Sequence, residues 1–408
     1  MKKNVIPNEW KKLRLGEITK HIGGTPLEKY VDNQSDYKFI SIGNYNTNGK
    51  YIDNGNRIQY NEKTKEKLLN KNDLVMVLND KTTDGKIIGN TIFIDENNKY
   101  IYNQRSERII CKDMVNPKFL WHYTNSSIFK KEILKRMQGG TQIYVNYKDI
   151  EKIELNIPSL EEQEKIVNIL DNVDKIIEQY EKILEEKDKF IKSQFIDMFG
   201  NPYTNNKKVE KCEIANVLTS IKSGLSRQLS DSNIGIPVIR SNNIVEGKIV
   251  NNDLKYWYIN DPKGADVNDY LLVKGDLLVN FINSIAQIGK SGIYDSDENC
   301  IYTTNLFRLR TNKKCNNVYL YYCFMMEDYW RQIRNIVQPA ANQASFTMND
   351  FKKIKILLPD IKKQEQFADL VIQIDKQKIK LKELIENYQK LKKSLIQKLL
   401  TGELRVKI

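Results

Sequence analysis

The sequence predicts an α+β protein built from two similar halves, each a mixed α/β globular domain followed by a long helix. Three observations predict this fold class. Segments of the first half recur roughly 200 residues later, each copy of the clearest repeat leads through a proline into a long amphipathic stretch, and 408 residues exceed the usual size of one domain. The repeat is therefore the main guide to the architecture.

The repeat is clearest where a strand-like run meets a proline. Residues 149–164 match residues 350–365 at a constant offset of 201 residues. In both copies alternating apolar residues precede Pro158 or Pro359, and the missing N–H and fixed φ of proline suit a strand exit followed by a helix start. Two shorter segments repeat as a turn entering a strand and as a strand, residues 72–77 with 275–280 and 101–103 with 301–303.

Two long helices follow the prolines. Apolar residues recur at three- and four-residue steps over 161–198 and again over 362–400. The run Gly200-Asn201-Pro202 is expected to end the first helix, and Gly402 suits the C-cap of the second. At about 1.5 Å per residue each helix is about 57 Å long, which is longer than one small domain needs.

The two helical segments carry opposite charge. Residues 161–198 hold six Lys against eleven Asp and Glu, a net −5, whereas residues 362–400 hold ten Lys against five, a net +5. Complementary charge beside two apolar stripes predicts an antiparallel coiled coil, the alternative being that each helix packs on its own domain. Because these segments cancel, the whole surplus of +13 falls elsewhere, chiefly on the globular domains, and favours a nucleic-acid partner.

Several other functions are disfavoured. The five cysteines form no CxxC pair, which argues against a disulfide framework and a zinc site and fits a reducing cytoplasm. No uncharged apolar stretch of about 18 residues predicts a membrane span. Asn201-Pro202-Tyr203 and Gly289-Lys290-Ser291 resemble parts of methyltransferase and phosphate-loop motifs, but the second proline and the upstream glycine are missing. The chain has only two histidines, which leaves little for histidine-based acid–base or metal chemistry. A self-contained enzyme is therefore not expected.

The repeated junctions 156–163 and 357–364, the tail 398–404 and the mid-chain run 198–202 together resemble the specificity subunits of type I restriction-modification systems. The likeness covers nearly the whole chain. It implies four parts, namely target-recognition domain 1 at 1–157, a central conserved coiled-coil helix at 158–199, target-recognition domain 2 at 200–358, and a C-terminal conserved coiled-coil helix with its tail at 359–408.

The resemblance also implies a function. Each recognition domain would read one half of a bipartite, asymmetric double-stranded DNA target, with the helices as a spacer ruler. Two methyltransferase subunits would dock on the helices and junctions for adenine N6 methylation, and two restriction subunits would add cleavage. No cofactor is expected on this chain, whereas S-adenosylmethionine is expected on the methyltransferase and ATP with Mg²⁺ on the restriction subunit. A coiled-coil adaptor without a DNA role and a methylation-only system remain open alternatives.

Candidate contact residues follow from side-chain chemistry, since Arg, Lys, Asn, Gln, Ser and Thr distinguish base edges or hold phosphates. The candidates in the first domain are Lys81, Thr82, Thr83, Lys86, Gln104, Arg105, Ser106, Thr141, Gln142 and Tyr144. Those in the second are Lys222, Ser226, Arg227, Arg240, Asn242, Asn243, Asn283, Asn342 and Gln343. The candidates for helix pairing or partner binding are Pro158, Gln163, Leu170, Ile177, Leu184, Pro359, Gln364, Leu384, Leu391 and Leu399.

Overall fold

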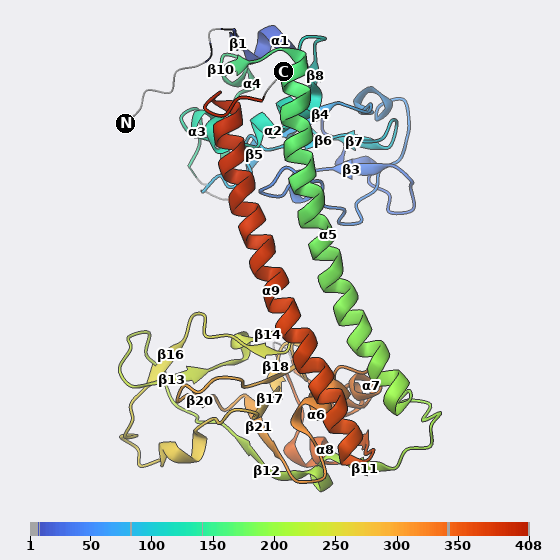
Figure 1. Cartoon of the computed structure of the whole chain (residues 1–408), viewed down its shortest axis with the longest axis vertical. Coiled ribbons are helices and arrows are strands. Elements are labelled where there is room, and N and C mark those ends of the chain that lie inside the picture. The colour runs from blue at the N-terminus through green and yellow to red at the C-terminus, as the bar shows by residue number, and fades with distance from the viewer. Residues whose placement is uncertain (1–6, 8, 82–83, 141, 341–342, 407–408) are drawn as a thin grey trace. The chain divides into compact units, whose positions relative to one another are not determined.

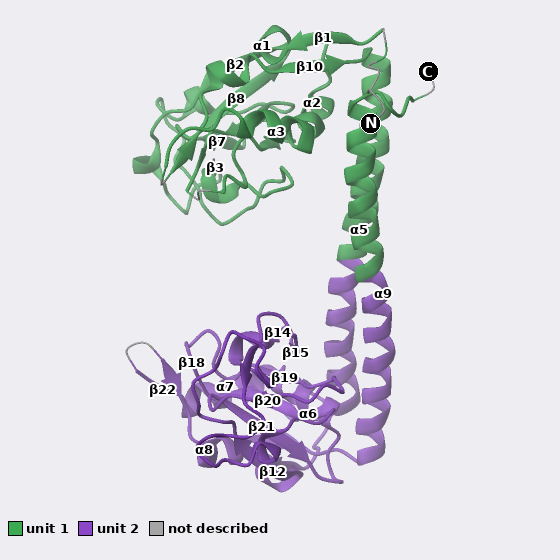
Figure 2. Cartoon of the chain, turned by 90° about the vertical axis from the view of Figure 1, so that its left-hand side faces the viewer, with its two compact units in different colours: residues 1–181, 382–408 green, residues 182–381 purple. Residues whose placement is uncertain are grey.

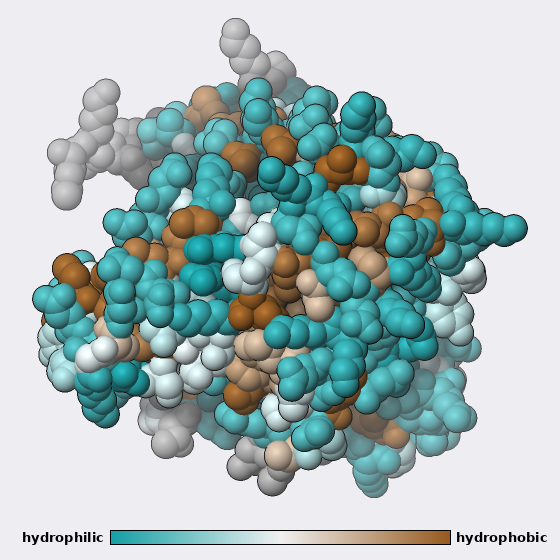
Figure 3. Space-filling view, turned by 90° about the horizontal axis from the view of Figure 1, so that it is seen from below, coloured by the Kyte–Doolittle hydropathy of each residue, from teal (hydrophilic) through white to brown (hydrophobic). Residues whose placement is uncertain are grey.

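A computed structural model of the chain describes residues 7, 9–81, 84–140, 142–340 and 343–406. The chain divides into two compact units, unit 1 formed by Met1–Glu181 with Lys382–Ile408 and unit 2 formed by Lys182–Leu381 (Figure 2). Each unit thus combines a globular part with a stretch of each long helix. The face drawn in Figure 3 is mostly hydrophilic, with hydrophobic residues scattered between polar ones.

Unit 1 is a mixed α/β domain. Its strands are β1 (Lys11–Arg14), β2 (Thr19–Gly23), β3 (Lys38–Ile40), β4 (Leu74–Val77), β5 (Asn79–Asp80), β6 (Thr91–Phe93), β7 (Tyr100–Tyr102), β8 (Ser106–Cys111), β9 (Ile143–Tyr144) and β10 (Glu154–Ile157). Its short helices are α1 (Leu15–Ile18), α2 (Pro117–Thr124), α3 (Ser127–Leu134) and α4 (Tyr147–Ile150). The larger sheet has the order β2-β8-β4-β6, while β1 pairs with β10, β3 with β7 and β5 with β9.

The core of unit 1 includes both long helices. Leu74, Ile109 and Phe119 from the sheet and α2 pack in one buried cluster with Leu170 and Leu399 from the two helices. A separate cluster lies between β4 and the β3-β7 pair. The chain ends of the unit are joined by Glu162, whose buried carboxylate accepts hydrogen bonds from the Trp10 indole at 3.0 Å and the Arg405 guanidinium at 2.9 Å.

Unit 2 repeats this plan. Its strands are β11 (Lys211–Glu213), β12 (Leu218–Ser223), β13 (Ile236–Ile239), β14 (Ile244–Val245), β15 (Lys248–Ile249), β16 (Lys255–Trp257), β17 (Leu277–Asn280), β18 (Ile282–Asn283), β19 (Ser291–Ile293), β20 (Ile301–Tyr302), β21 (Leu306–Thr311), β22 (Gln338–Pro339), β23 (Ala344–Ser345) and β24 (Lys355–Leu357). Its short helices are α6 (Asn317–Phe324), α7 (Glu327–Ile336) and α8 (Met348–Lys352). The sheet order β12-β21-β17-β19 matches β2-β8-β4-β6 of unit 1, with β15 and β14 added.

The two long helices are α5 (Leu160–Phe199) and α9 (Ile361–Leu400), which confirms both predicted helices to within one residue at each end (Figure 1). Gly200 with φ +85° and Gly402 with φ +74° lie just beyond the helix ends, in the left-handed conformation that glycine adopts without strain. The sequence therefore located the helices from apolar periodicity and from these two stops.

The helices pair antiparallel, as their charges predict. In unit 1 the Asp174 carboxylate lies 2.7 Å from the Lys392 ammonium, and the Tyr180 and Tyr388 rings lie 5.8 Å apart. In unit 2 Asp188 of α5 forms an ion pair with Lys378 of α9 at 2.5 Å. Among the residues predicted for helix pairing, Leu170, Ile177 and Leu399 are buried and Leu184 is half-buried, whereas Leu384 and Leu391 are exposed.

A buried glutamine locks the start of each long helix to its unit. The Gln163 amide nitrogen donates to the Met114 and Pro158 carbonyls at 3.1 and 2.9 Å, and its oxygen accepts from the Asn116 N–H at 2.8 Å. Gln364 makes the same three bonds in unit 2, to Lys314, Pro359 and Asn316. Both glutamines are 0% exposed, so the spacing from proline to glutamine in the repeat serves this lock.

We expect Gln163→Leu to lower the free energy of unfolding of unit 1 by about 2–5 kcal/mol, because three backbone groups, one of them in a fully buried hydrogen bond, lose their partner. Urea denaturation followed by circular dichroism measures the change. Gln179→Leu, at an exposed position of the same helix, is the matched control and is expected to change stability by less than about 0.5 kcal/mol. Equal midpoints for the two variants would contradict the lock.

A buried histidine joins α2 to α5 within unit 1. His122 Nε2 lies 3.1 Å from an oxygen of Asp171, whose other oxygen accepts from Lys118 at 2.6 Å. Burial lowers the pKa of His122 below its usual 6.5, so the neutral imidazole is the folded form. Although burial opposes it, the hydrogen bonds from His122 and Lys118 lower the pKa of Asp171 to about 2.

This histidine makes unit 1 less stable in acid. Because the folded-state pKa of His122 lies below the unfolded value of 6.5, the unfolded chain binds the proton first and stability falls as the pH drops through about 6.5. Urea titrations at pH 7.5 and pH 5.5 are expected to show a smaller loss for His122→Gln than for the wild type. His21→Gln is the control, because it leaves His122 in place and with it the contribution of His122 to the loss of stability between the two pH values. A loss in His122→Gln equal to that of the wild type would contradict the assignment of this acid sensitivity to His122.

Candidate nucleic-acid interface

Three loops of unit 1 meet at the end of β4. The Leu78 N–H donates to the Arg105 carbonyl at 2.9 Å, and the Val145 N–H donates to the Leu78 carbonyl at 3.0 Å. Next to Leu78, β5 pairs with β9, with Asn79 opposite Tyr144. The described residues of the candidate segments 81–86, 103–106 and 139–144, which are separate in the sequence, therefore lie around the same end of β4.

Unit 2 builds the same arrangement around Phe281. The Phe281 N–H donates to the Asn305 carbonyl and the Phe346 N–H donates to the Phe281 carbonyl, both at 3.1 Å. Strand β18 pairs with β23, with Asn283 opposite Ala344. The candidates Asn283 and Gln343 are thus brought together, whereas Asn342 lies outside the described residues.

The unit 1 candidates differ in how open they are to solvent. Lys81, Gln104 and Gln142 are exposed, as is Tyr144 at 40% exposure. Lys86 is exposed and forms an ion pair with Asp84 at 2.9 Å. Thr82, Thr83 and Thr141 lie outside the described residues.

Arg105 and Ser106 are adjacent but have different surroundings. Arg105 is half-buried, and within the described residues its guanidinium has no carboxylate partner. Ser106 is 1% exposed and lies 2.9 Å from the Tyr45 hydroxyl, which donates to its Oγ. Arg105 can therefore offer its donors to a ligand, whereas Ser106 holds the loop.

The arginines of unit 2 are held by carboxylates. Arg227 makes a two-pronged pair with Asp261, whose side chain is 0% exposed, with contacts of 2.8 to 3.2 Å. Arg240 lies 2.9 Å from Asp253. These pairs fix the positions of the two guanidinium groups.

The remaining unit 2 candidates divide into exposed and structural residues. Lys222 pairs with Asp269 at 2.8 Å and lies over the Tyr270 ring. Ser226 and Asn242 are exposed. Asn243 is 1% exposed and serves the loop itself, because its amide donates to the Val250 and Asn252 carbonyls.

The role of Asn243 has a counterpart that the sequence analysis missed. Asn44, in the 3-10 turn Ile42–Asn44, is 0% exposed and accepts from the Ser41 N–H at 2.9 Å, as Asn243 in the turn Ser241–Asn243 accepts from the Arg240 N–H at 2.9 Å. The signal in the sequence for this shared role was that the two halves have asparagines at positions 199 residues apart.

Within the described residues, no group of three or more His, Cys, Asp or Glu side chains is placed to hold a metal ion. No helix in the same part of the chain is both long and apolar enough to cross a membrane.

Comparison with known proteins decides the family. The model of the type I restriction modification DNA specificity domain matches the chain twice, over residues 7–189 and 206–392. The chain belongs to this family. Both matches include a globular part and a stretch of long helix, as the repeated architecture requires.

Three specificity subunits are related in sequence. The chain is 33% identical over 193 residues to the putative type I restriction enzyme MjaX specificity subunit of Methanocaldococcus jannaschii, covering 46% of this chain and 44% of that protein. It is 23% identical over 305 residues to the EcoKI specificity subunit of Escherichia coli K12, covering 70% and 65%. The matches thus span less than two thirds of these two proteins. The MjaVIII specificity subunit of M. jannaschii is 26% identical over 428 positions, covering 98% and 94%.

Two solved structures share the fold of this chain. One is the crystal structure of the type I restriction-modification S subunit from M. genitalium, with a TM-score of 0.54, 14% identity, and coverage of 98% of this chain and 99% of that one. The other comes from a study of complex assembly and conformational transition of the type I R-M system, with a TM-score of 0.60, 15% identity, and coverage of 98% and 100%.

The loop 103–106 of the specificity domain depends on a glycine. A Cβ on Gly24 would lie 1.8 Å from the Asn103 carbonyl oxygen, so Gly24→Ala is expected to displace this loop and lower the stability of unit 1 by about 1–3 kcal/mol. Thermal unfolding measures the loss. Gly140→Ala is the control, because a Cβ there meets nothing within 4 Å. Equal unfolding temperatures would show that the close contact is not required.

Proposed function

We propose that each unit reads one half of a bipartite, asymmetric DNA target and that the chain acts as the non-catalytic specificity subunit of a type I restriction-modification complex. The observation that carries this proposal is the repetition of the three-loop arrangement around Leu78 and Phe281 with different side chains on the loops. Equal scaffolds with unequal contact residues suit two different half-sites. The surplus of +13 lies outside the helical segments 161–198 and 362–400 and suits phosphate contacts by the units.

The long helices would set the spacing between the half-sites. Each has 40 residues, which at about 1.5 Å per residue gives about 60 Å. Two readers on one face of a duplex need a separation of about one helical turn, on the order of 34 Å, or a multiple of it. A paired helix of fixed length would therefore act as the ruler.

The helices also offer surfaces for two methyltransferase subunits. Among the described residues of α5 and α9, eight large apolar side chains are exposed, namely Leu160, Ile183, Phe190, Ile196, Ile372, Ile379, Leu384 and Leu391. In unit 2 a groove of about 490 Å³ between the helices is lined by Ile183, Phe190 and Leu370. Exposed apolar groups of this kind are typical of protein interfaces. S-adenosylmethionine would be held by the methyltransferase, and ATP with Mg²⁺ by two restriction subunits.

The direct test is selection of bound sequences from random double-stranded DNA by the chain assembled with its methyltransferase subunit. The expected product is two short, different blocks separated by a constant spacer, with affinity that falls steeply as salt rises. Binding that is absent or insensitive to salt would instead support a coiled-coil adaptor.

Arg105 and Arg240 are expected to act on different halves of the target. Arg105→Ala should cost about 1–3 kcal/mol of DNA binding and relax base preference in one block, and Arg240→Ala should do so in the other. Competition titrations with probes altered in one block at a time measure both effects. Arg57→Ala is the control, because Arg57 pairs with Asp53 outside the candidate loops. If both variants relaxed the same block, the assignment of one unit to each half would be wrong.

A further inference from the structure

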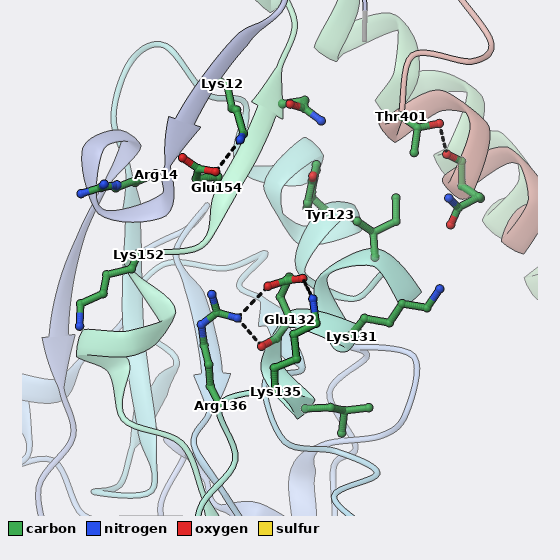
Figure 4. A pocket seen from close by; sticks show the side chains of 14 residues that line it. Lys12, Arg14, Tyr123, Lys131, Glu132, Lys135, Arg136, Lys152, Glu154 and Thr401 are labelled. Atoms are coloured by element: carbon green, nitrogen blue, oxygen red, sulfur yellow. Dashed lines mark hydrogen bonds and ion pairs between the residues drawn. The ribbon is translucent and has the colours of Figure 1, made fainter. Parts of the chain in front are cut away.

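A basic groove in unit 1 lies outside the loops proposed to read DNA. It has a volume of about 900 Å³ and lies between β10, β1 and α3, beside the end of α9 (Figure 4). Six cationic side chains line it, against the two carboxylates of Glu132 and Glu154, and they are Lys12, Arg14, Lys131, Lys135, Arg136 and Lys152. We call this feature the α3–β10 groove.

The outer edge of β10 opens into this groove. Leu13 of β1 stands opposite Leu155, and the Leu15 N–H donates to the Ile153 carbonyl. Because hydrogen-bonded pairs alternate along an antiparallel ladder, the N–H and C=O of Glu154 point away from β1. Neither group has a hydrogen-bond partner within the described residues.

Unit 2 closes the same edge with a side chain. The Gln332 amide donates to the Lys355 carbonyl at 2.8 Å, and the Lys355 N–H donates to the Gln332 side-chain oxygen at 2.8 Å. Lys355 follows Glu154 by the 201-residue offset of the repeat. The carboxamide thus satisfies the donor and the acceptor of one outward-facing strand residue.

Unit 1 has a glutamate where unit 2 has this glutamine. Ile133 lies against Gly89 as Ile333 lies against Gly289, so Glu132 of α3 corresponds to Gln332 of α7. A carboxylate cannot donate to the Glu154 carbonyl. The Glu132 side chain instead accepts from Lys135 and Arg136, as the dashed contacts in Figure 4 show. This single difference leaves the edge of unit 1 open.

We propose that the α3–β10 groove binds an extended, acidic segment of a partner polypeptide, anchored by a two-point backbone contact with Glu154. A peptide unit carries the same donor and acceptor as the Gln332 carboxamide and adds to a strand edge in a known mode of recognition. A DNA phosphate could accept from the Glu154 N–H but could not donate to its carbonyl. The two unsatisfied backbone groups therefore favour a peptide over nucleic acid.

Charge and shape specify the occupant further. Lys131 is exposed, and neither it nor Arg14 has a carboxylate partner in the described part of the chain, so both can meet acidic side chains. Leu134, at 42% exposure, and Ile128 supply apolar contact on the α3 side. The groove adjoins β10, which leads into α5, so this inference rests on the proposed docking of the methyltransferase subunits on the long helices and assigns a segment of one such subunit to unit 1.

The test compares Glu132→Gln with Glu132→Ala in the full chain. Both variants remove the same charge, but only glutamine can close the edge as Gln332 does. We expect Glu132→Gln to weaken binding of the methyltransferase subunit by about tenfold relative to Glu132→Ala, from the loss of two backbone hydrogen bonds. Hydrogen exchange at the Glu154 amide should slow when the wild-type complex forms, and should be slow in Glu132→Gln without the partner.

The outcomes separate this inference from the function on which it rests. Failure of the wild-type chain to bind the methyltransferase subunit would overturn the proposed docking and this inference with it. A complex with unchanged exchange at Glu154, or equal affinity of the two variants, would overturn the inference alone. Self-association of the free chain that Glu132→Gln abolishes would assign the groove to a second copy and would also overturn it.

Discussion

The buried amides of Gln163 and Gln364 are the contacts on which the link between the globular parts and the long helices depends. Each amide lies in the first turn of its long helix. It bonds to the proline at the strand exit and to the loop that precedes α2 in unit 1 or α6 in unit 2. A buried three-bond contact of this kind has a defined geometry and is costly to break. The same local attachment is thus made at both junctions, whatever side chains the loops around Leu78 and Phe281 carry.

Much of the fold could be predicted because its strongest signals are local. Apolar periodicity and two glycine stops located α5 and α9, and opposite charge predicted their antiparallel pairing, which Asp174 with Lys392 and Asp188 with Lys378 confirm. The pairing of strands into sheets was harder to predict from the sequence. Strands of two or three residues such as β5 pair with distant partners, and no local pattern encodes which partner a strand that short will take.

The candidate site could be predicted in its loops but not in its individual residues. Donor-rich segments were found from composition, whereas their meeting at Leu78 and Phe281 depends on backbone hydrogen bonds that leave no sequence signature. Which candidates are free to contact a ligand depends on burial. Asn243, for example, has suitable donors, but they are hydrogen-bonded within its own loop. The α3–β10 groove is open because unit 1 has Glu132 where unit 2 has Gln332. The effect of this one-residue difference can be recognised only when the edges of β10 and β24 are compared.

We propose that one chain carries two different readers at a fixed spacing. Mapping N6-methyladenine across the genome of cells that express this chain with its methyltransferase subunit tests this proposal. The expected result is a single bipartite motif with two unlike halves and a constant spacer. A continuous palindrome, or a spacer that varies from site to site, would contradict it.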